Sequence, residues 1–364
     1  PDVVVVTGDV LSGYMYHGQP LFVEDIWEKF STSFHESDTY YAYIMGNHDA
    51  DEKDNIPPER IFQAEMKSKY SLLAASQNQS FENFNYYIPI YSNIKPGNVS
   101  TMLWLFDSHS EGCSEEGRSW GCVERSQNEW YEETAKKLQV QNGKNIHHLG
   151  FVHIPPPEYM ALYNDHEYYG DRLEDVSCPL VNTGFFDLLK KIGEITAIFV
   201  GHDHLNDYGG WIDGIELIYG RKTGYGGYGQ EGGRQRGARV IELQEKLNED
   251  GSLKVERNHY IVLEDPSKEQ ELSKQKEMRR RDGIRQRMCL HAGRKESIFE
   301  AILWIVITLG VVRGFGFFFD KKIVKHMKQA GVDLPISIVS MKNTDAKSPG
   351  KDGNDSIFID DLAV

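Results

Sequence analysis

The sequence predicts an α/β protein with a buried sheet flanked by helices, and three observations support this class. Apolar, β-branched runs recur along the first two hundred residues, and they lack the polar alternation of a half-exposed strand. Helical spacing fills the intervals between these runs, which is the alternation typical of a largely parallel sheet. Beyond Gly210 the pattern changes to short runs separated by turns, which indicates antiparallel strands.

The predicted elements alternate along the chain. Buried strands are expected over residues 3–6, 40–45, 102–106, 146–152 and 195–200. Helices are expected between them, over residues 20–33, 57–73, 127–140 and 183–192. Antiparallel strands are expected over residues 212–219, 238–243 and 259–263. Together they predict one domain over residues 1–265.

Composition limits the class of partner. The chain has 364 residues, 40% of them apolar and 12% aromatic, which is enough for a full core. Its formal net charge of −15 disfavours a nucleic-acid groove, so no nucleic-acid partner is expected. The basic residues between 274 and 295 indicate a solvated helix face or a membrane-flanking segment rather than a binding patch.

The C-terminal third predicts three further segments. Residues 266–297 are expected to be a charged helical linker, and residues 321–364 a disordered polar tail. Between them, residues 301–319 are apolar with Arg313 as the only charge, which is long enough to span hydrocarbon. We therefore expect a single membrane-spanning helix over 298–320. The alternative is a buried or interfacial helix. Basic residues on both sides leave its orientation open.

Cysteines and sequons bear on the compartment. Cys113 and Cys122 lie nine residues apart in a polar loop, where a small disulfide and two free thiols are equally compatible with the sequence. Sequons at Asn78, Asn98 and Asn354 favour the secretory pathway only slightly. The localisation predicted is membrane-associated, with the side of the membrane open.

Short polar motifs follow the predicted strands and carry the chemistry. They are Gly8-Asp9, Gly46-Asn47-His48-Asp49, His153, and Gly201-His202-Asp203-His204. Residues at the ends of buried strands are held rigidly, so these side chains are expected to converge on one cleft. One Asp, one Asn and three His suit Zn, Fe or Mn better than Ca or Mg. The sequence therefore predicts a metal site.

These motifs, in this order, resemble the calcineurin-like metallophosphoesterase superfamily. Three further stretches, 151–159, 178–186 and 201–229, resemble its purple-acid-phosphatase-like subgroup from plants, fungi and protists. The resemblance covers residues 1–265. It implies a β-sandwich of two mixed sheets flanked by helices, whose first strand precedes this sequence, and a site for two metal ions (Fe, Zn or Mn).

The resemblance also implies roles for the individual residues. Asp9 would bridge the two metals, His204 would bind the first metal, and the second would be bound by Asn47, His153 and His202. Among the catalytic residues, His48 would donate a proton to the leaving oxygen or stabilise charge on phosphorus, and Asp49 would orient its ring.

The sequence departs from the pattern in two places. An Asp-x-His that should supply two ligands of the first metal is absent from these 364 residues. Ser12 stands where purple acid phosphatases carry a tyrosine ligand, so a ferric–tyrosinate centre is not expected.

The implied function is hydrolysis of phosphomonoesters, small molecules or phosphoproteins, by a metal-bound hydroxide at the dinuclear centre. The alternatives are a phosphodiesterase or nucleotide pyrophosphatase on the same scaffold, and a catalytically inactive, membrane-tethered binding module. Arg221, Lys222 and Tyr225, in a glycine-rich stretch, are candidate substrate-binding residues. A flexible loop between strands is an equal alternative for that stretch.

Overall fold

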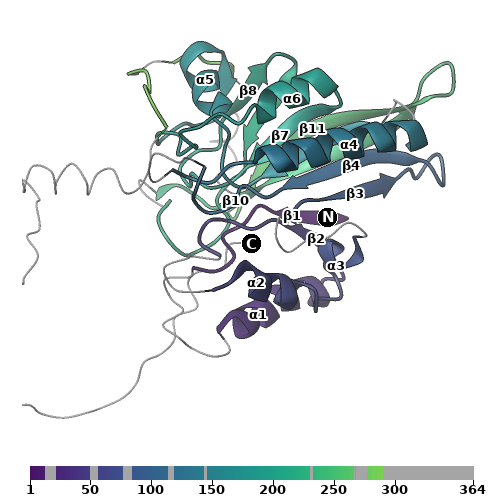
Figure 1. The fold of residues 1–364 in the computed structure, drawn as a ribbon, viewed down its shortest axis with the longest axis horizontal. Helices are drawn as coiled ribbons and strands as arrows, with labels where there is room; N and C mark the ends of the chain where they lie inside the picture. The colour runs from purple at the N-terminus through teal and green to yellow at the C-terminus, as the bar shows by residue number, and fades with distance from the viewer. Residues whose placement is uncertain are drawn as a thin grey trace, which may run out of the picture. The chain divides into compact units, whose positions relative to one another are not determined.

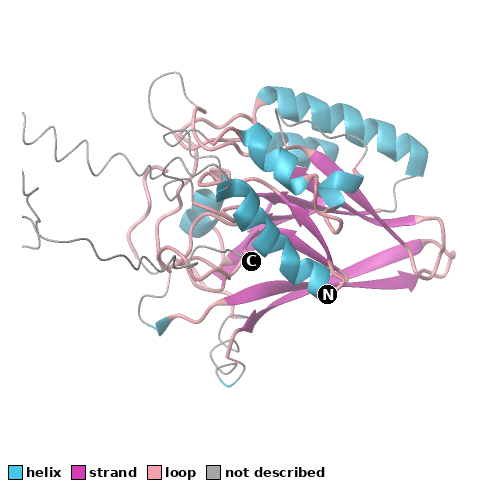
Figure 2. Ribbon diagram, turned by 90° about the horizontal axis from the view of Figure 1, so that it is seen from below, coloured by secondary structure: helices cyan, strands magenta, loops and turns pink. Residues whose placement is uncertain are grey.

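The computed structural model describes residues 1–12, 22–49, 56–76, 84–113, 119–142, 146–229, 233–265, 267, 277–281 and 283–289 (Figure 1). All of these residues belong to one compact unit. The unit is α/β, with mixed sheets and helices on both sides of the strands, as predicted. A long helix lies across the front of the strands in the view from below (Figure 2).

A seven-stranded mixed sheet forms the centre of the unit. Its strand order is β3-β4-β5-β7-β9-β8-β6. The four middle strands are parallel to one another, and the outer ones are antiparallel to their neighbours. The bounds are β3 Tyr86–Tyr91, β4 Val99–Phe106, β5 His147–Val152, β6 Tyr168–Tyr169, β7 Ile195–Val200, β8 Gly209–Ile212 and β9 Ile215–Tyr219.

Two smaller sheets and six helices complete the unit. Strand β1 (Val3–Val6) pairs in parallel with β2 (Tyr40–Tyr43), and β10 (Gly237–Leu247) pairs antiparallel with β11 (Leu253–Leu263). The helices are α1 (Phe22–Glu36), α2 (Pro58–Glu65), α3 (Leu72–Ala75), α4 (Arg125–Asn142), α5 (Glu158–Asp165) and α6 (Phe185–Ile192). Figure 1 shows α4, α5 and α6 on one side of the large sheet, with β1, β2, α1 and α2 on the other.

Two apolar cores cover the two faces of the large sheet. In β4 the side chains alternate between them: Leu103 and Leu105 pack with β1, β2 and α1, whereas Met102, Trp104 and Phe106 pack with α4 and α6. Burial on both faces explains why this strand is a continuous apolar run in the sequence.

Several elements differ from the sequence prediction. The run 212–219 is a hairpin of two strands, because Asp213 and Gly214 form a turn with φ of 47° and 86°. The helix expected over 57–73 is divided into α2 and α3. Strands β3 and β6 and helix α5 were not predicted.

The expected helical linker is not helical where it is described, in 277–281 and 283–289. It is attached to the main body instead. Cys289 forms a disulfide with Cys178, and Gln286 exchanges hydrogen bonds with the backbone of Val176 at 2.8 and 2.9 Å. Arg285 pairs with Asp165. These long-range contacts outweigh the local helix propensity of the basic stretch.

The predicted membrane helix over 298–320 and the tail over 321–364 lie outside the described residues. Within the described ranges, no helix has the length and apolar character needed to cross a bilayer.

A buried ion-pair network joins the large sheet to β11 and gives a testable pH dependence. Glu216 on β9 accepts hydrogen bonds from Arg257 (2.6 Å) and Tyr169 (2.8 Å) and lies 3.3 Å from His259. Burial alone would raise the pKa of Glu216, but the bond with His259 and the charge of Arg257 outweigh it and lower that pKa to about 2.

This carboxylate should stabilise the fold above its unfolded pKa of about 4.5, and the contribution, on the order of 3 kcal/mol, should vanish as the pH falls towards 2. We expect Glu216→Gln to lower the free energy of unfolding at pH 7 and to remove part of the loss between pH 5 and 3. Urea unfolding at several pH values tests this, with Glu242→Gln on the exposed side of β10 as the control. Parallel pH profiles for wild type and Glu216→Gln would contradict it.

Candidate metal centre

Four of the predicted ligands come from the ends of four strands. Asp9 follows β1, Asn47 follows β2, His153 follows β5 and His202 follows β7. Since β1 and β2 are parallel, and β5 and β7 are parallel neighbours in the large sheet, each pair of carboxyl ends meets at the same edge. Residues nearly two hundred positions apart are thereby brought together.

The loops that carry these ligands are tightly packed and conformationally unusual. Asp9 and His202 adopt positive φ angles of 58° and 71°, which non-glycine residues rarely adopt. Gly8 and Gly46 allow the first two loops to touch: a Cβ on Gly46 would lie 2.2 Å from Oδ1 of Asp9. Gly8 and Gly46 are therefore required, because a side chain at either position would prevent the close approach of the two loops.

Gly46→Ala is expected to displace the Asp9 carboxylate, because the new methyl group would overlap both Oδ1 and the backbone nitrogen of Asp9. We expect a loss of at least about 10-fold in metal affinity. The rise in melting temperature on addition of Zn²⁺ or Mn²⁺ measures it. Gly150→Ala on β5 is the control, because its Cβ would meet only ordinary contacts at 3.5 Å and beyond. An equal metal response in the two variants would contradict the role of Gly46.

The four side chains point their polar atoms at one another. The Nε2 atom of His153 lies 3.3 Å from Oδ2 of Asp9 and 3.0 Å from Oδ1 of Asn47. Nδ1 of His202 lies 2.8 Å from the same Asn47 oxygen. Two ligands of one zinc ion, each about 2.1 Å from it, lie roughly 3.4 Å apart in tetrahedral geometry. The observed separations are close to this spacing.

The hydrogen bond on the other side of His153 sets its tautomer. Nδ1 lies 2.5 Å from the carbonyl oxygen of Thr7, and a carbonyl can only accept, so Nδ1 carries the proton. In the neutral ring Nε2 then presents its lone pair to two oxygen acceptors, Asp9 and Asn47. A lone pair facing two acceptors is balanced by a cation.

His202 supports the same conclusion. Its Nε2 atom is buried and has no hydrogen-bond partner among the described residues. Burial, together with the neighbouring His153, holds the pKa of His202 well below its ordinary value, so the ring stays neutral and able to bind a metal. Ligand atoms of Asp9, His153 and His202 lie within 4.8 Å of one another. The residues present therefore fit a transition-metal ion.

Charge within the site is complementary. Burial would raise the pKa of Asp9, but the charge and hydrogen bond of His153 hold it below its ordinary value. Burial would lower the pKa of His153, but the Asp9 carboxylate raises it. Without a metal, these shifts favour a proton on Nε2 of His153 beside the Asp9 carboxylate, and a bound divalent ion would take the place of that proton.

Asp49 holds the first two loops together. Its carboxylate accepts hydrogen bonds from the backbone nitrogens of Asp9 (2.7 Å), Leu11 (2.9 Å) and Gly46 (2.7 Å) and from the hydroxyl of Tyr43 (2.9 Å). Burial and the charge of Asp9 raise the pKa of Asp49 to about 6. We expected Asp49 to orient the His48 ring, but these bonds commit both oxygens to the loops that place Asp9 and Asn47.

His48 lies beside Asp9. Its backbone nitrogen donates to Oδ1 of Asp9 at 2.9 Å, and the residue is partly exposed. Asp9 and His202 are also partly exposed, whereas Asn47 and His153 are buried. Asp9, His48 and His202 are therefore the members of the centre that retain some accessible surface.

The structure does not bring His204 into this group. Its Nδ1 atom lies 3.0 Å from the carbonyl oxygen of Tyr228, and its ring stacks on the Tyr228 ring at 4.1 Å between centroids. Burial and the charge of Lys222 lower the pKa of His204 to about 4. As in His153, the Nδ1 atom of His204 therefore carries the proton and donates it to a backbone carbonyl. The Nε2 atom of His204 carries the lone pair of the neutral ring.

The three candidate substrate-binding residues are placed differently from one another. Arg221 is buried and bonded to the Asp207 carboxylate at 2.5 Å and to the carbonyl of Gln235, so it is a structural ion-pair partner rather than a substrate contact. Tyr225 is exposed, but its hydroxyl donates to Glu264 and the Arg236 guanidinium covers its ring. Lys222 lies beside the His204 loop, next to Gly227 and Gly229.

Sequence reasoning missed Thr7 and Trp120. The Thr7 carbonyl sets the His153 tautomer, and backbone atoms leave no signal in residue types. Trp120 contacts His202 edge to face, at 4.6 Å between centroids. It lies in the loop closed by the Cys113–Cys122 disulfide, which the structure forms. The cysteine pair was the available signal in the sequence, because the disulfide ties Cys122, two residues from Trp120, to Cys113.

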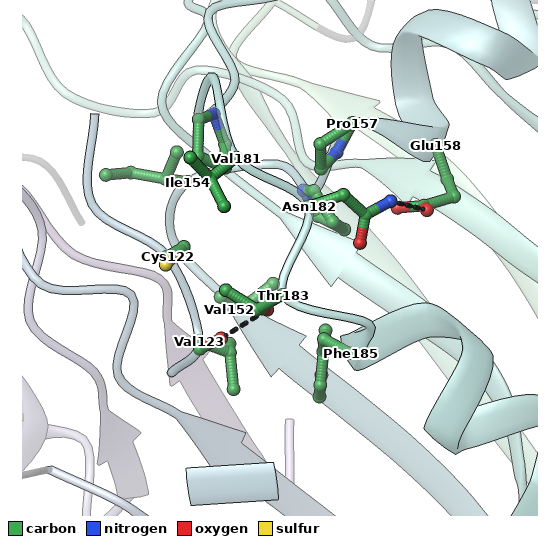
Figure 3. Close-up of a pocket in the computed structure, with 12 residues that line it drawn as sticks. Cys122, Val123, Val152, Ile154, Pro157, Glu158, Val181, Asn182, Thr183 and Phe185 are labelled. Atoms are coloured by element: carbon green, nitrogen blue, oxygen red, sulfur yellow. Dashed lines mark hydrogen bonds between the residues drawn. The ribbon is translucent and has the colours of Figure 1, made fainter. Parts of the chain in front are cut away.

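A small pocket lies next to the centre without containing it (Figure 3). Val152 and Ile154 flank His153 in sequence and line it, together with Val123 and Phe185. The amide of Asn182 donates to Glu158 at 2.7 Å across its rim. None of the predicted metal ligands is among the lining residues.

Comparisons with known proteins show the family of this chain. The sequence model described as calcineurin-like phosphoesterase matches residues 1–206. Two Arabidopsis thaliana proteins are similar: "Probable inactive purple acid phosphatase 14" is 30% identical over 263 residues (67% of this chain, 63% of that protein), and "Probable inactive purple acid phosphatase 29" is 31% identical over 260 residues (66% and 64%). The chain thus spans a little under two thirds of their length.

Among solved structures, a dimetal phosphatase from Danio rerio is 15% identical, with a TM-score of 0.40, and the likeness covers 60% of this chain and 72% of that one.

Proposed function

The chain belongs to the calcineurin-like phosphoesterase family, and from this we propose that it is a metal-dependent phosphoesterase that hydrolyses phosphomonoesters at a centre of two metal ions. The family resemblance expected from the sequence is confirmed. Substrates of the whole protein, small molecules or phosphoproteins, are part of the proposal.

One observation carries it. The Thr7 carbonyl fixes the proton of His153 on Nδ1, so that Nε2 faces Asp9 and Asn47 at 3.3 and 3.0 Å. Three ligand atoms of suitable type, directed at one point from three separate loops, are what a metal hydrolase requires. Without a metal, Nε2 of His153 would instead carry a proton and donate it to Asp9.

Metal ions held by Asp9, Asn47, His153 and His202, with His204 as the ligand that the family implies for the other metal, would draw charge from the phosphoryl oxygens and acidify a water molecule. The residues of the chain contribute orientation and a proton. Asp49 holds the Asp9 and Asn47 loops at a fixed separation through its backbone bonds. His48, partly exposed beside Asp9, is placed to donate its ring proton to the leaving-group oxygen.

A second candidate function is metal-dependent binding without hydrolysis. The names of the Arabidopsis relatives, "probable inactive", favour it. Both candidates require the same ligands, so metal content does not separate them, whereas turnover does.

The test is turnover by the full-length natural protein loaded with Zn²⁺, Mn²⁺ or Fe²⁺. We expect hydrolysis of p-nitrophenyl phosphate to exceed that of bis-p-nitrophenyl phosphate, and His48→Ala to lower kcat by about 100-fold with the metal retained. Faster cleavage of the diester would indicate a phosphodiesterase. A protein that binds metal but cleaves neither substrate, with the same rate as its His48→Ala variant, would be a binding module.

We further propose that the protein resides in the secretory pathway. Both disulfides, Cys113–Cys122 and Cys178–Cys289, persist only in an oxidising compartment. Asn98, the only described acceptor among the three sequons, is exposed. Loss of one glycan mass from the expressed protein on Asn98→Gln would support this, and an unglycosylated protein with four free thiols would contradict it.

A further inference from the structure

Several contacts of its sequence neighbours hold Trp120 beside His202. Cys122 forms a disulfide with Cys113, and Trp120 forms an isolated antiparallel bridge with Glu111. Gly121 donates to the carbonyl of Ser110, and a Cβ on Gly121 would lie 2.2 Å from the carbonyl oxygen of Ser108. The position of the Trp120 backbone is therefore fixed before any substrate arrives.

The indole ring lies against a predicted metal ligand. Its plane is nearly perpendicular to that of the His202 imidazole, with an interplanar angle of 82° and centroids 4.6 Å apart. Trp120 is partly exposed, like His202 and Asp9. Trp120 and His202 therefore lie in contact, each with part of its surface accessible to solvent.

A second aromatic ring lies against His204, the other histidine of this motif, in a stacked rather than an edge-to-face arrangement. Tyr228 stacks on His204, and 45% of its surface is exposed. Its hydroxyl donates to Glu174 at 2.9 Å, which fixes the direction of the ring. His202 and His204 are two residues apart, so the two aromatic side chains come from different loops to adjacent ligands.

An aromatic ring with an accessible face can pack against an aromatic group of a bound ligand. We propose that Trp120 and Tyr228 form an aromatic rim, which selects phosphomonoesters whose leaving group is a phenol, with its aromatic ring bonded to the bridging ester oxygen. The inference rests on the proposed function. The contact of Trp120 with His202 is short, so a ring one bond from the phosphate can reach the rim.

The test is equilibrium binding of two inert substrate analogues to the zinc-loaded full-length protein, phenylphosphonate and methylphosphonate, by isothermal titration calorimetry. Wild type is expected to bind phenylphosphonate about 3- to 10-fold more tightly, the range that one aromatic contact contributes. Trp120→Ala should lose most of this preference with its affinity for methylphosphonate unchanged, and Trp120→Phe should keep it. Trp211→Ala, an exposed tryptophan on β8, is the matched control.

The outcomes separate the rim from the proposed function. Equal binding of the two phosphonates by wild type would overturn the rim and leave the phosphoesterase in place. Failure of the zinc-loaded protein to bind either phosphonate would overturn both. A Trp120→Ala variant that loses zinc and methylphosphonate together would show that Trp120 only supports His202, which also overturns the rim.

Discussion

Asp9→Asn should lower metal affinity by at least about 100-fold and abolish hydrolysis, the largest effect expected of any single substitution in this chain. The substitution keeps the shape of the side chain and removes its charge. Oδ1 of Asp9 accepts the backbone proton of His48 at 2.9 Å, whereas Oδ2 faces His153 at 3.3 Å. A neutral amide can keep the first contact, but it cannot balance a divalent ion at the second.

Metal content after dialysis, measured by mass spectrometry, tests this expectation. Asp187→Asn, an exposed aspartate in the first turn of α6, is the control and should retain wild-type metal. Retention of full metal content and activity by Asp9→Asn would mean that the metal, if any, is bound elsewhere in the chain.

Removal of the Cys178–Cys289 disulfide is expected to have the largest effect on stability. The bond closes a loop of 111 residues, and the chain-entropy relation gives about 4.8 kcal/mol for a loop of this size, against about 2.6 kcal/mol for the nine-residue Cys113–Cys122 loop. It also anchors the segment 283–289, where Gln286 accepts from Val176 and Arg172.

Urea unfolding of two matched double variants, Cys178→Ser with Cys289→Ser and Cys113→Ser with Cys122→Ser, measures both losses. The first should lose more free energy of unfolding than the second. The reverse order would show that segment 283–289 is held mainly by its hydrogen bonds and ion pairs rather than by the covalent link.

Continuous apolar strands bounded by turn residues were the most predictable part of the fold. β1 and β7 have the predicted bounds, because turn residues end each apolar run directly after the last buried position. The hairpin of β8 and β9 was merged into one strand, although Asp213-Gly214 is a strong turn signal. Segment 277–289 could not be predicted locally, because a cysteine more than a hundred residues away determines its conformation.

The order of the motifs predicted that the metal ligands converge, but it could not assign a role to every residue. Asp9, Asn47, His153 and His202 meet in space, and the strand ends that carry them were recognisable in the sequence. Arg221 was expected to face substrate, but nothing in a glycine-rich stretch distinguishes such a cation from one whose side chain is buried against Asp207, as it is here. Trp120 was missed because its importance depends on the direction of a loop.

Anomalous X-ray diffraction from crystals loaded with Zn²⁺ or Mn²⁺ tests most directly whether Asp9, Asn47 and His153 bind the same metal ion. We expect a peak about 2.0–2.2 Å from Nε2 of His153, Oδ1 of Asn47 and a carboxylate oxygen of Asp9, and no such peak in crystals of His153→Ala. A fully loaded protein whose anomalous peaks lie away from these three atoms would contradict the account.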